Sequence, residues 1–151
     1  MRRRRITLID DSRETQLRFL ASVQEEVELQ AITVAPFFDD QVETAIKEFD
    51  PDLIVIDLHL TRSEESGFRV LRLLKESSVS NIPIVVCSRF ISDTSEDANK
   101  AKALLLGAIA ALPKFPFPTL QDLFKLLEQD ESDIDPRLSD VGSTTDKPTL
   151  T

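Results

Sequence analysis

A chain of 151 residues, of which 41% are apolar and 30% charged, has room for one ordinary globular domain but not for a second. Its formal net charge of −9 argues against direct binding to nucleic-acid phosphates or anionic membrane surfaces, which require clustered Lys and Arg. The basic cluster at residues 2–5 precedes a short apolar stretch that ends in two acids, so we expect neither a signal peptide nor a membrane span. The single cysteine, Cys87, lies in an apolar run and is predicted to be a buried thiol in a cytoplasmic protein.

Apolar segments alternate with segments of helical periodicity along the chain. Strands are predicted at about residues 4–10, 29–34, 52–58, 82–88 and 109–113, and helices near 13–26, 38–49, 67–78, 95–106 and 118–129. In the first helix, Leu17, Leu20 and Val23 recur at near-helical spacing and predict its apolar side. The order (βα)5 predicts an α/β fold, in which a five-stranded parallel sheet carries helices on both faces.

The end of the chain has a different composition from the rest. Residues 130–151 are rich in acidic, Ser, Thr and Pro residues and have few apolar side chains to bury. We therefore expect one domain at residues 4–129, followed by an acidic, disordered tail at 130–151.

Acidic residues follow two of the predicted strands. Asp57 follows an apolar run that is typical of a central strand, and Asp10 with Asp11 follows the first strand. Because ligands bind outside the carboxyl ends of parallel strands, these carboxylates are expected at one site. Carboxylate oxygens suit a hard cation such as Mg²⁺, and the backbone carbonyl of His59 is expected to complete the set. Asp11 also stands where it would cap the first helix, and the two roles are compatible.

Two further strand ends add polar groups to the same edge, Ser88 after the fourth strand and Lys114 after the fifth. Three acids, a hydroxyl and an ammonium suit phosphoryl transfer onto a carboxylate, because Mg²⁺ and Lys neutralise the phosphoryl oxygens while the hydroxyl donates a hydrogen bond. Asp57 is the expected nucleophile.

Over about residues 4–129, the chain resembles the receiver domains of two-component response regulators, which have a flavodoxin-like fold. The resemblance rests on six segments taken in order: residues 9–12, 49–58, 67–68, 82–88, 106–108 and 112–114. It implies that Asp57 accepts a phosphoryl group from a phosphohistidine on a sensor kinase or phosphotransfer protein. It also implies that Asp10 and Asp11 bind Mg²⁺, that Ser88 is the conformational-switch hydroxyl, and that Lys114 contacts the phosphoryl group.

We expect a stand-alone receiver, because no effector domain follows residue 130. It is expected to take part in its own phosphoryl transfer and dephosphorylation without being an enzyme. Its output would be altered binding to a downstream protein. Dimerisation or docking is expected at the fourth helix, the fifth strand and the fifth helix. The candidates for exposure there are Leu104, Leu105, Ile109 and Phe117.

Three positions depart from the family pattern. Ala111 stands where an aromatic residue usually turns inward, so the loop at residues 88–99 is expected to carry the conformational change instead. Arg89 replaces a small residue, and its guanidinium is expected either to crowd the pocket or to contact phosphoryl oxygens. Phe115 separates Lys114 from Pro116, whereas the family usually has Pro directly after the Lys.

Two other classes of function remain open on the sequence. One is a pseudo-receiver, an interaction module that works without phosphorylation; the acid triad disfavours it. The other is a phosphatase of the haloacid dehalogenase type, because residues 57–61 loosely resemble that family's nucleophile loop. Here His59 replaces the general acid of that loop, and the nucleophile follows the third strand instead of the first, which disfavours this class.

Overall fold

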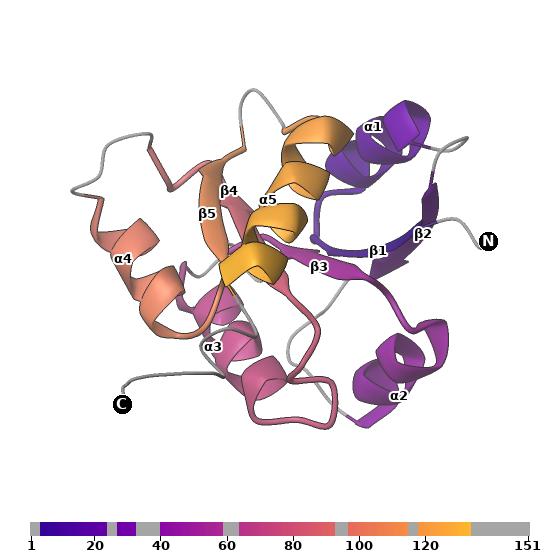
Figure 1. Ribbon diagram of the computed structural model, residues 1–151, viewed down its shortest axis with the longest axis horizontal. Coiled ribbons are helices and arrows are strands. Elements are labelled where there is room, and N and C mark those ends of the chain that lie inside the picture. The colour runs from indigo at the N-terminus through magenta and orange to yellow at the C-terminus, as the bar shows by residue number, and fades with distance from the viewer. Residues whose placement is uncertain are drawn as a thin grey trace. The chain divides into compact units, whose positions relative to one another are not determined.

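The computed structural model describes residues 4–23, 27–32, 40–58, 64–92, 97–114 and 118–133. The strands are β1 (Arg4–Ile9), β2 (Val27–Ile32), β3 (Leu53–Ile56), β4 (Ile84–Ser88) and β5 (Ala110–Pro113). The helices are α1 (Arg13–Val23), α2 (Asp40–Phe49), α3 (Glu64–Lys75), α4 (Ala98–Leu105) and α5 (Leu120–Asp133). All neighbouring strands are parallel, in the order β2-β1-β3-β4-β5 (Figure 1).

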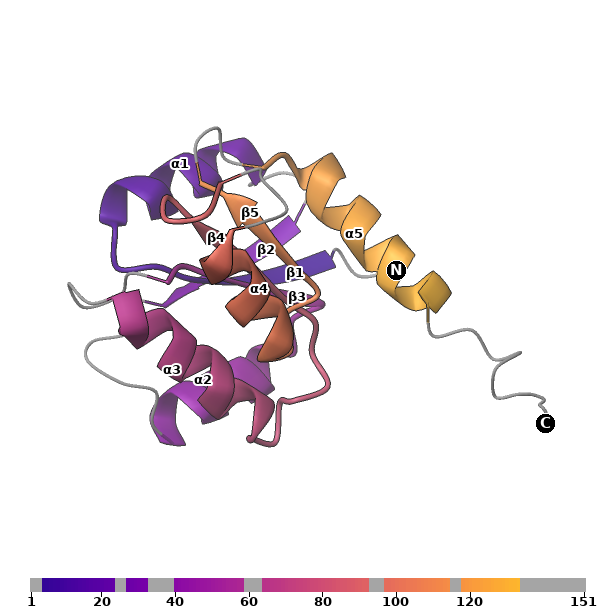
Figure 2. The same cartoon turned by 90° about the vertical axis from the view of Figure 1, so that its left-hand side faces the viewer.

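The sheet has helices on both faces, as the sequence predicts. Figure 2 shows α1 on one side of the sheet, with α2 and α3 on the other. At one edge, α4 contacts β5. The parallel sheet and the alternating helices together confirm the predicted (βα)5, flavodoxin-like fold.

The two central strands form the middle of the core. Every residue of β3 and β4 is buried, which explains why β3 is apolar throughout and β4 is apolar up to the site residue Ser88. From the helices, Ile46 of α2 and Phe68 and Leu71 of α3 join the same buried cluster. Burying one large apolar side chain stabilises the fold by about 1.5–3 kcal/mol, so this cluster fixes where β3 and β4 end.

The rotation of α1 differs from the prediction made from its leucines. Leu17, predicted on the apolar side, is 53% exposed, whereas Gln16 and Phe19 are buried. The physical reason is a polar contact at the start of the helix: Gln16 Nε2 donates to the backbone oxygen of Asp10 at 2.6 Å. That hydrogen bond turns the face with Gln16 and Phe19 inward and leaves Leu17 facing solvent.

Several boundaries also differ from the prediction by two or three residues. Strand β2 begins at Val27, because Val27 is buried and pairs with Arg4 of β1. Helix α3 begins at Glu64, which brings Gly67 into its first turn, and it ends at Lys75. Beyond that end, Ser77 Oγ donates to the carbonyl oxygen of Leu74 at 2.7 Å, and this contact replaces a further helical turn.

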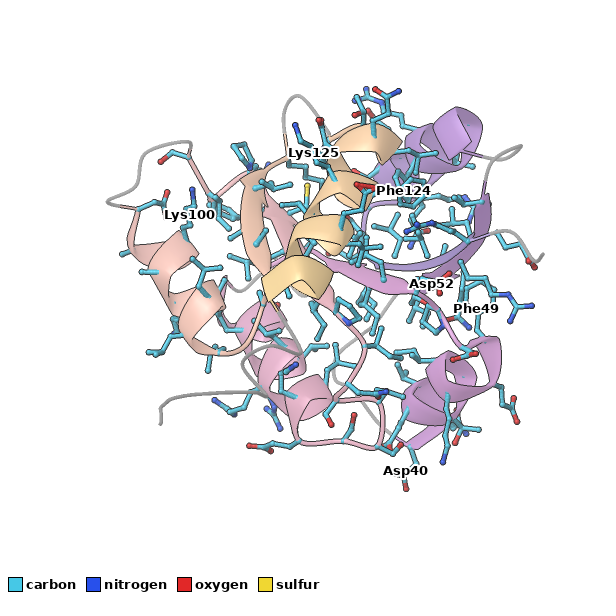
Figure 3. All side chains as sticks on the ribbon, in the orientation of Figure 1. Asp40, Phe49, Asp52, Lys100, Phe124 and Lys125 are labelled. Carbon is cyan, nitrogen blue, oxygen red and sulfur yellow. The ribbon has the colours of Figure 1, made fainter. Side chains whose placement is uncertain are left out.

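The amino ends of the strands are held by Arg5 of β1. Its backbone N–H donates to Asp52 Oδ2 at 2.8 Å, and its guanidinium donates to the carbonyl oxygen of Phe49 at 2.9 Å. Figure 3 labels Asp52 and Phe49 where α2 leads into β3. Arg5 also forms an ion pair with Glu28 of β2. These contacts explain why a charged residue, Arg5, lies within β1, near the end of the sheet opposite Asp10 and Asp57.

The chain divides into two units, residues up to Pro118 and residues from Thr119. In the second unit, Thr119 and Asp122 form a reciprocal cap at the start of α5, since each backbone N–H donates to the other's side chain. Helix α5 continues to Asp133, so residues 130–133 of the predicted tail are helical. The remainder of the predicted tail lies outside the described residues. Among the described helices, none is long and apolar enough to cross a membrane.

Candidate functional site

Strand pairing brings the acidic residues together. Strands β1 and β3 are parallel neighbours in the register Ile9 with Ile56, so the next residues, Asp10 and Asp57, lie side by side. The backbone N–H of Asp57 donates to the oxygen of Ile9 at 3.0 Å, which extends the pairing by one residue. Carboxylate oxygens of Asp10, Asp11 and Asp57 lie within 4.8 Å of one another. Asp10 and Asp57 are buried, and Asp11 is exposed.

A tight turn after β1 orients Asp10. Asp10 Oδ1 accepts a hydrogen bond from the backbone N–H of Ser12 at 2.8 Å. Ser12 Oγ in turn accepts a hydrogen bond from the backbone N–H of Thr15 at 3.2 Å. Ser12 is therefore the N-cap of α1, a role that the sequence suggested for Asp11. The turn therefore fixes one carboxylate and starts the helix in the same three residues.

Lys114 bridges the two buried carboxylates. Its Nζ lies 2.9 Å from Asp10 Oδ2 and 3.0 Å from Asp57 Oδ2. Strand β5 positions it: Pro113 pairs with Ser88 of β4, and the backbone N–H of Lys114 donates to the oxygen of Ser88 at 3.1 Å. The ammonium thus reaches Asp57 from two strands away and Asp10 from three strands away.

Burial and the neighbouring groups together shift the pKa values of Asp10 and Lys114. Burial raises the pKa of Asp10; the N–H of Ser12 opposes this, and the charge of Asp57 adds to it. For Lys114, burial alone would lower the pKa, but the hydrogen bond to Asp10 and the charge of Asp57 raise it overall. Lys114 is therefore a stable cation, and the crowded carboxylates favour a second positive charge.

The three carboxylates fit a magnesium ion. Two oxygens bound to one Mg²⁺ lie at most about 4.2 Å apart, since each bond is about 2.0–2.1 Å long. The observed spread of up to 4.8 Å therefore needs a contraction of only several tenths of an ångström. Asp10, Asp11 and Asp57 would supply hard oxygen ligands. The backbone carbonyl expected from His59 lies outside the described residues.

Ser88 ends β4 and is fully buried. Its Oγ accepts a hydrogen bond from the backbone N–H of Phe90 at 3.2 Å. The backbone oxygen of Phe90 then accepts from Asn99 Nδ2 at 3.0 Å, which joins this loop to the first turn of α4. Ala111, at the usual position of the aromatic residue, is buried in one cluster with Ile91 from the same loop.

Above the acids is a cavity of about 330 Å³ with a polar lining. Its lining residues are Asp11, Ser12, Glu14, Thr15, Arg18, Asp57, Arg89 and Lys114. Sequence reasoning missed Glu14, Thr15 and Arg18. The available signal was the spacing of Glu14 and Arg18, four residues apart on the helix that follows the acidic pair.

The remaining sequence expectations concern Cys87 and the exposed leucines. Cys87 is buried, as predicted, and burial together with the charge of Asp57 raises its pKa to about 12. On α4, Leu104 is 44% and Leu105 87% exposed, while Ile109 is only partly exposed. Phe117 lies outside the described residues.

No protein-family model matches the chain, and no curated protein matches it in sequence. Solved structures do match. The response regulator domain of CheB from Thermotoga maritima has a TM-score of 0.57 at 19% identity, over 92% of this chain and 99% of that one. A response regulator from Desulfuromonas acetoxidans has a TM-score of 0.63 at 20% identity, over 87% and 98%. The signal receiver domain of an HD domain-containing protein from Pseudomonas fluorescens has a TM-score of 0.64 at 19% identity, over 87% and 97%. The chain therefore has the receiver-domain fold of response regulators.

Proposed function

We propose that this chain is a phosphoacceptor receiver of a two-component phosphorelay and that Asp57 takes the phosphoryl group from a phosphohistidine. The observation that carries the proposal is the surroundings of Asp57 at the end of a buried central strand. Its carboxylate lies with those of Asp10 and Asp11 within 4.8 Å, and the Lys114 ammonium lies 3.0 Å from its Oδ2. This set of residue types suits an anionic group that becomes bound to a carboxylate.

In the transfer, a carboxylate oxygen of Asp57 attacks phosphorus; an O–P bond forms and the N–P bond of the donor breaks. The electron pair of that bond goes to the imidazole nitrogen, which takes a proton from solvent. Lys114 provides fixed positive charge beside the attacking carboxylate. Magnesium held by Asp10, Asp11 and Asp57, with the His59 carbonyl, would neutralise charge on the phosphoryl oxygens.

Ser88 is the proposed donor of a hydrogen bond to the phosphoryl group. Its Oγ accepts from the Phe90 N–H, and an accepting hydroxyl can still donate its own hydrogen. A shift of Ser88 toward the phosphoryl group would act on Phe90 and, through Asn99, on the start of α4. This route does not need an aromatic residue at position 111.

The proposed partners follow from the same chemistry. A sensor histidine kinase or phosphotransfer protein in the cytoplasm would donate the phosphoryl group, and a downstream protein or a second copy of the chain would bind the altered α4 region. The exposure of Leu104 and Leu105 supports a protein contact on α4, because these adjacent leucines are 44% and 87% exposed within the described chain.

The test is the intact mass of the full chain after incubation with acetyl phosphate and Mg²⁺. The expected result is a gain of one phosphoryl group, which is absent for Asp57→Asn and absent when EDTA replaces Mg²⁺. If a phosphorylated histidine donor also gave no adduct while Mg²⁺ binding was demonstrable, the phosphoacceptor assignment would be wrong. The pseudo-receiver would then be the better description.

A further inference from the structure

The cavity above the acids contains basic residues that the proposed transfer does not use. Arg18 lines it from α1 and Arg89 lines it from the residue after β4, so two separate elements bring guanidinium groups to one space. Both side chains are exposed, as groups that meet an incoming ligand must be. Neither is part of the carboxylate and ammonium cluster beneath them.

Each guanidinium contacts one neighbour among the described residues. Arg18 pairs with Glu14 one helical turn earlier, at 2.5 Å between Nη2 and Oε1. Arg89 lies over the ring of Phe90, 5.1 Å from its centroid. A guanidinium has five N–H donors, and one carboxylate or one ring face engages only part of this set. Both groups can therefore bind oxygens of a further anion without losing the contact that holds them.

The charge balance indicates when an anion will bind. With Asp10 counted, four acidic and three basic side chains surround the cavity, which gives a formal charge of −1. A divalent cation on the carboxylates would change this to +1. Anion binding should therefore depend on the cation, and the exposed guanidiniums supply positive charge outside the cluster of Asp10, Asp11 and Asp57.

We propose that Arg18 and Arg89 form an outer anion site that binds the oxygens of a doubly charged phosphate group, and so make the cavity selective for phosphoryl donors. The proposal rests on the function proposed above, because the phosphate bound at the outer site would be that of the donor whose phosphoryl group is transferred to Asp57 in the same cavity. The oxygens of the incoming phosphate would meet these guanidiniums before phosphorus reaches Asp57.

The probe is inorganic phosphate, titrated into the full chain with Mg²⁺ or with EDTA at fixed ionic strength and followed by calorimetry. The variants are Arg18→Gln, Arg89→Gln and Arg89→Lys. The control is Arg69→Gln on α3, which is exposed and outside the cavity lining. Because all of these side chains are exposed, thermal unfolding should be unchanged. Phosphorylation of each variant by acetyl phosphate is measured in parallel by intact mass.

We expect phosphate to bind in Mg²⁺ and each Arg→Gln variant at the rim to weaken binding about three- to ten-fold. The phosphate affinity of Arg89→Lys should lie between those of the wild type and Arg89→Gln, since lysine keeps the charge and loses the planar pair of donors. Unchanged affinity in both rim variants, or no phosphate binding by the wild type, would overturn the outer site while leaving phosphorylation of Asp57 intact. Arginine-dependent phosphate binding by a chain that gains no adduct from acetyl phosphate or from a phosphorylated histidine donor would support the site and refute the proposed function.

Discussion

Gly67 in the first turn of α3 is the position at which a small change should disturb the site most. A Cβ atom on Gly67 would lie 2.2 Å from the Cα of Leu58 and 2.4 Å from the backbone oxygen of Asp57. Ordinary contacts begin at 3.4 Å, so helix and strand end would have to separate by about 1.2 Å. We therefore expect Gly67→Ala to lower the free energy of unfolding by about 1–3 kcal/mol, as overpacking does. A shift of about 1 Å at Asp57 should also slow its phosphorylation about 100-fold.

Urea unfolding followed by circular dichroism measures the first effect, since the chain has no Trp or Tyr for fluorescence. A time course of intact mass with acetyl phosphate measures the second. Arg69→Ala, on the same helix and exposed, should change stability by less than about 0.5 kcal/mol and leave the rate unaltered. If Gly67→Ala matched this control in both assays, the close approach of α3 to the Asp57 backbone would be refuted.

Three other predictions follow from single contacts. Lys114→Met leaves two buried carboxylates without their shared cation and should cost about 3–5 kcal/mol in urea unfolding with EDTA and less with Mg²⁺; equal losses in both would contradict the bridge. Asp97→Ala removes the N-cap of α4 and should cost about 1 kcal/mol at neutral pH. Backbone hydrogen bonds lower the pKa of Asp97 below its ordinary 3.8, so this contribution is present above that pH and is lost as the pH falls through the lower folded value; a pH-independent difference in melting temperature would count against it. Cys87, with a pKa of about 12, should react with a thiol reagent at pH 8 only as fast as the chain unfolds, and rapid native labelling would argue against its burial.

The acids of the site could be predicted because their placement depends on strands alone. Once Ile9 and Ile56 end neighbouring parallel strands, the residues that follow must share one edge of the sheet. The uninterrupted apolar character of β3 identified it as a central strand. Asp10 and Asp57 therefore needed no information about side-chain packing to be brought together.

The reach of Lys114 needed more than its place after a strand. Its Nζ bridges two carboxylates only because β5 pairs with β4 in the register of Ser88 with Pro113. A shift of one residue would move the side chain to the other face of the sheet. The sequence indicates the strand but not this register. The position of Lys114 at the carboxyl edge of the sheet could therefore be predicted, but its two ion pairs with Asp10 and Asp57 could not.

The rotation of α1 could not be predicted from the sequence, because the helix has two candidate apolar faces. Leu17 and Phe19 lie roughly 160° apart on a helix, so only one of them can face the sheet. Periodicity favours the leucine, but the hydrogen bond from Gln16 to the Asp10 backbone selects the phenylalanine. That choice also directs Arg18 toward the cavity. The charges that α1 contributes to the cavity are thus set by one buried amide, which hydrophobic pattern alone does not reveal.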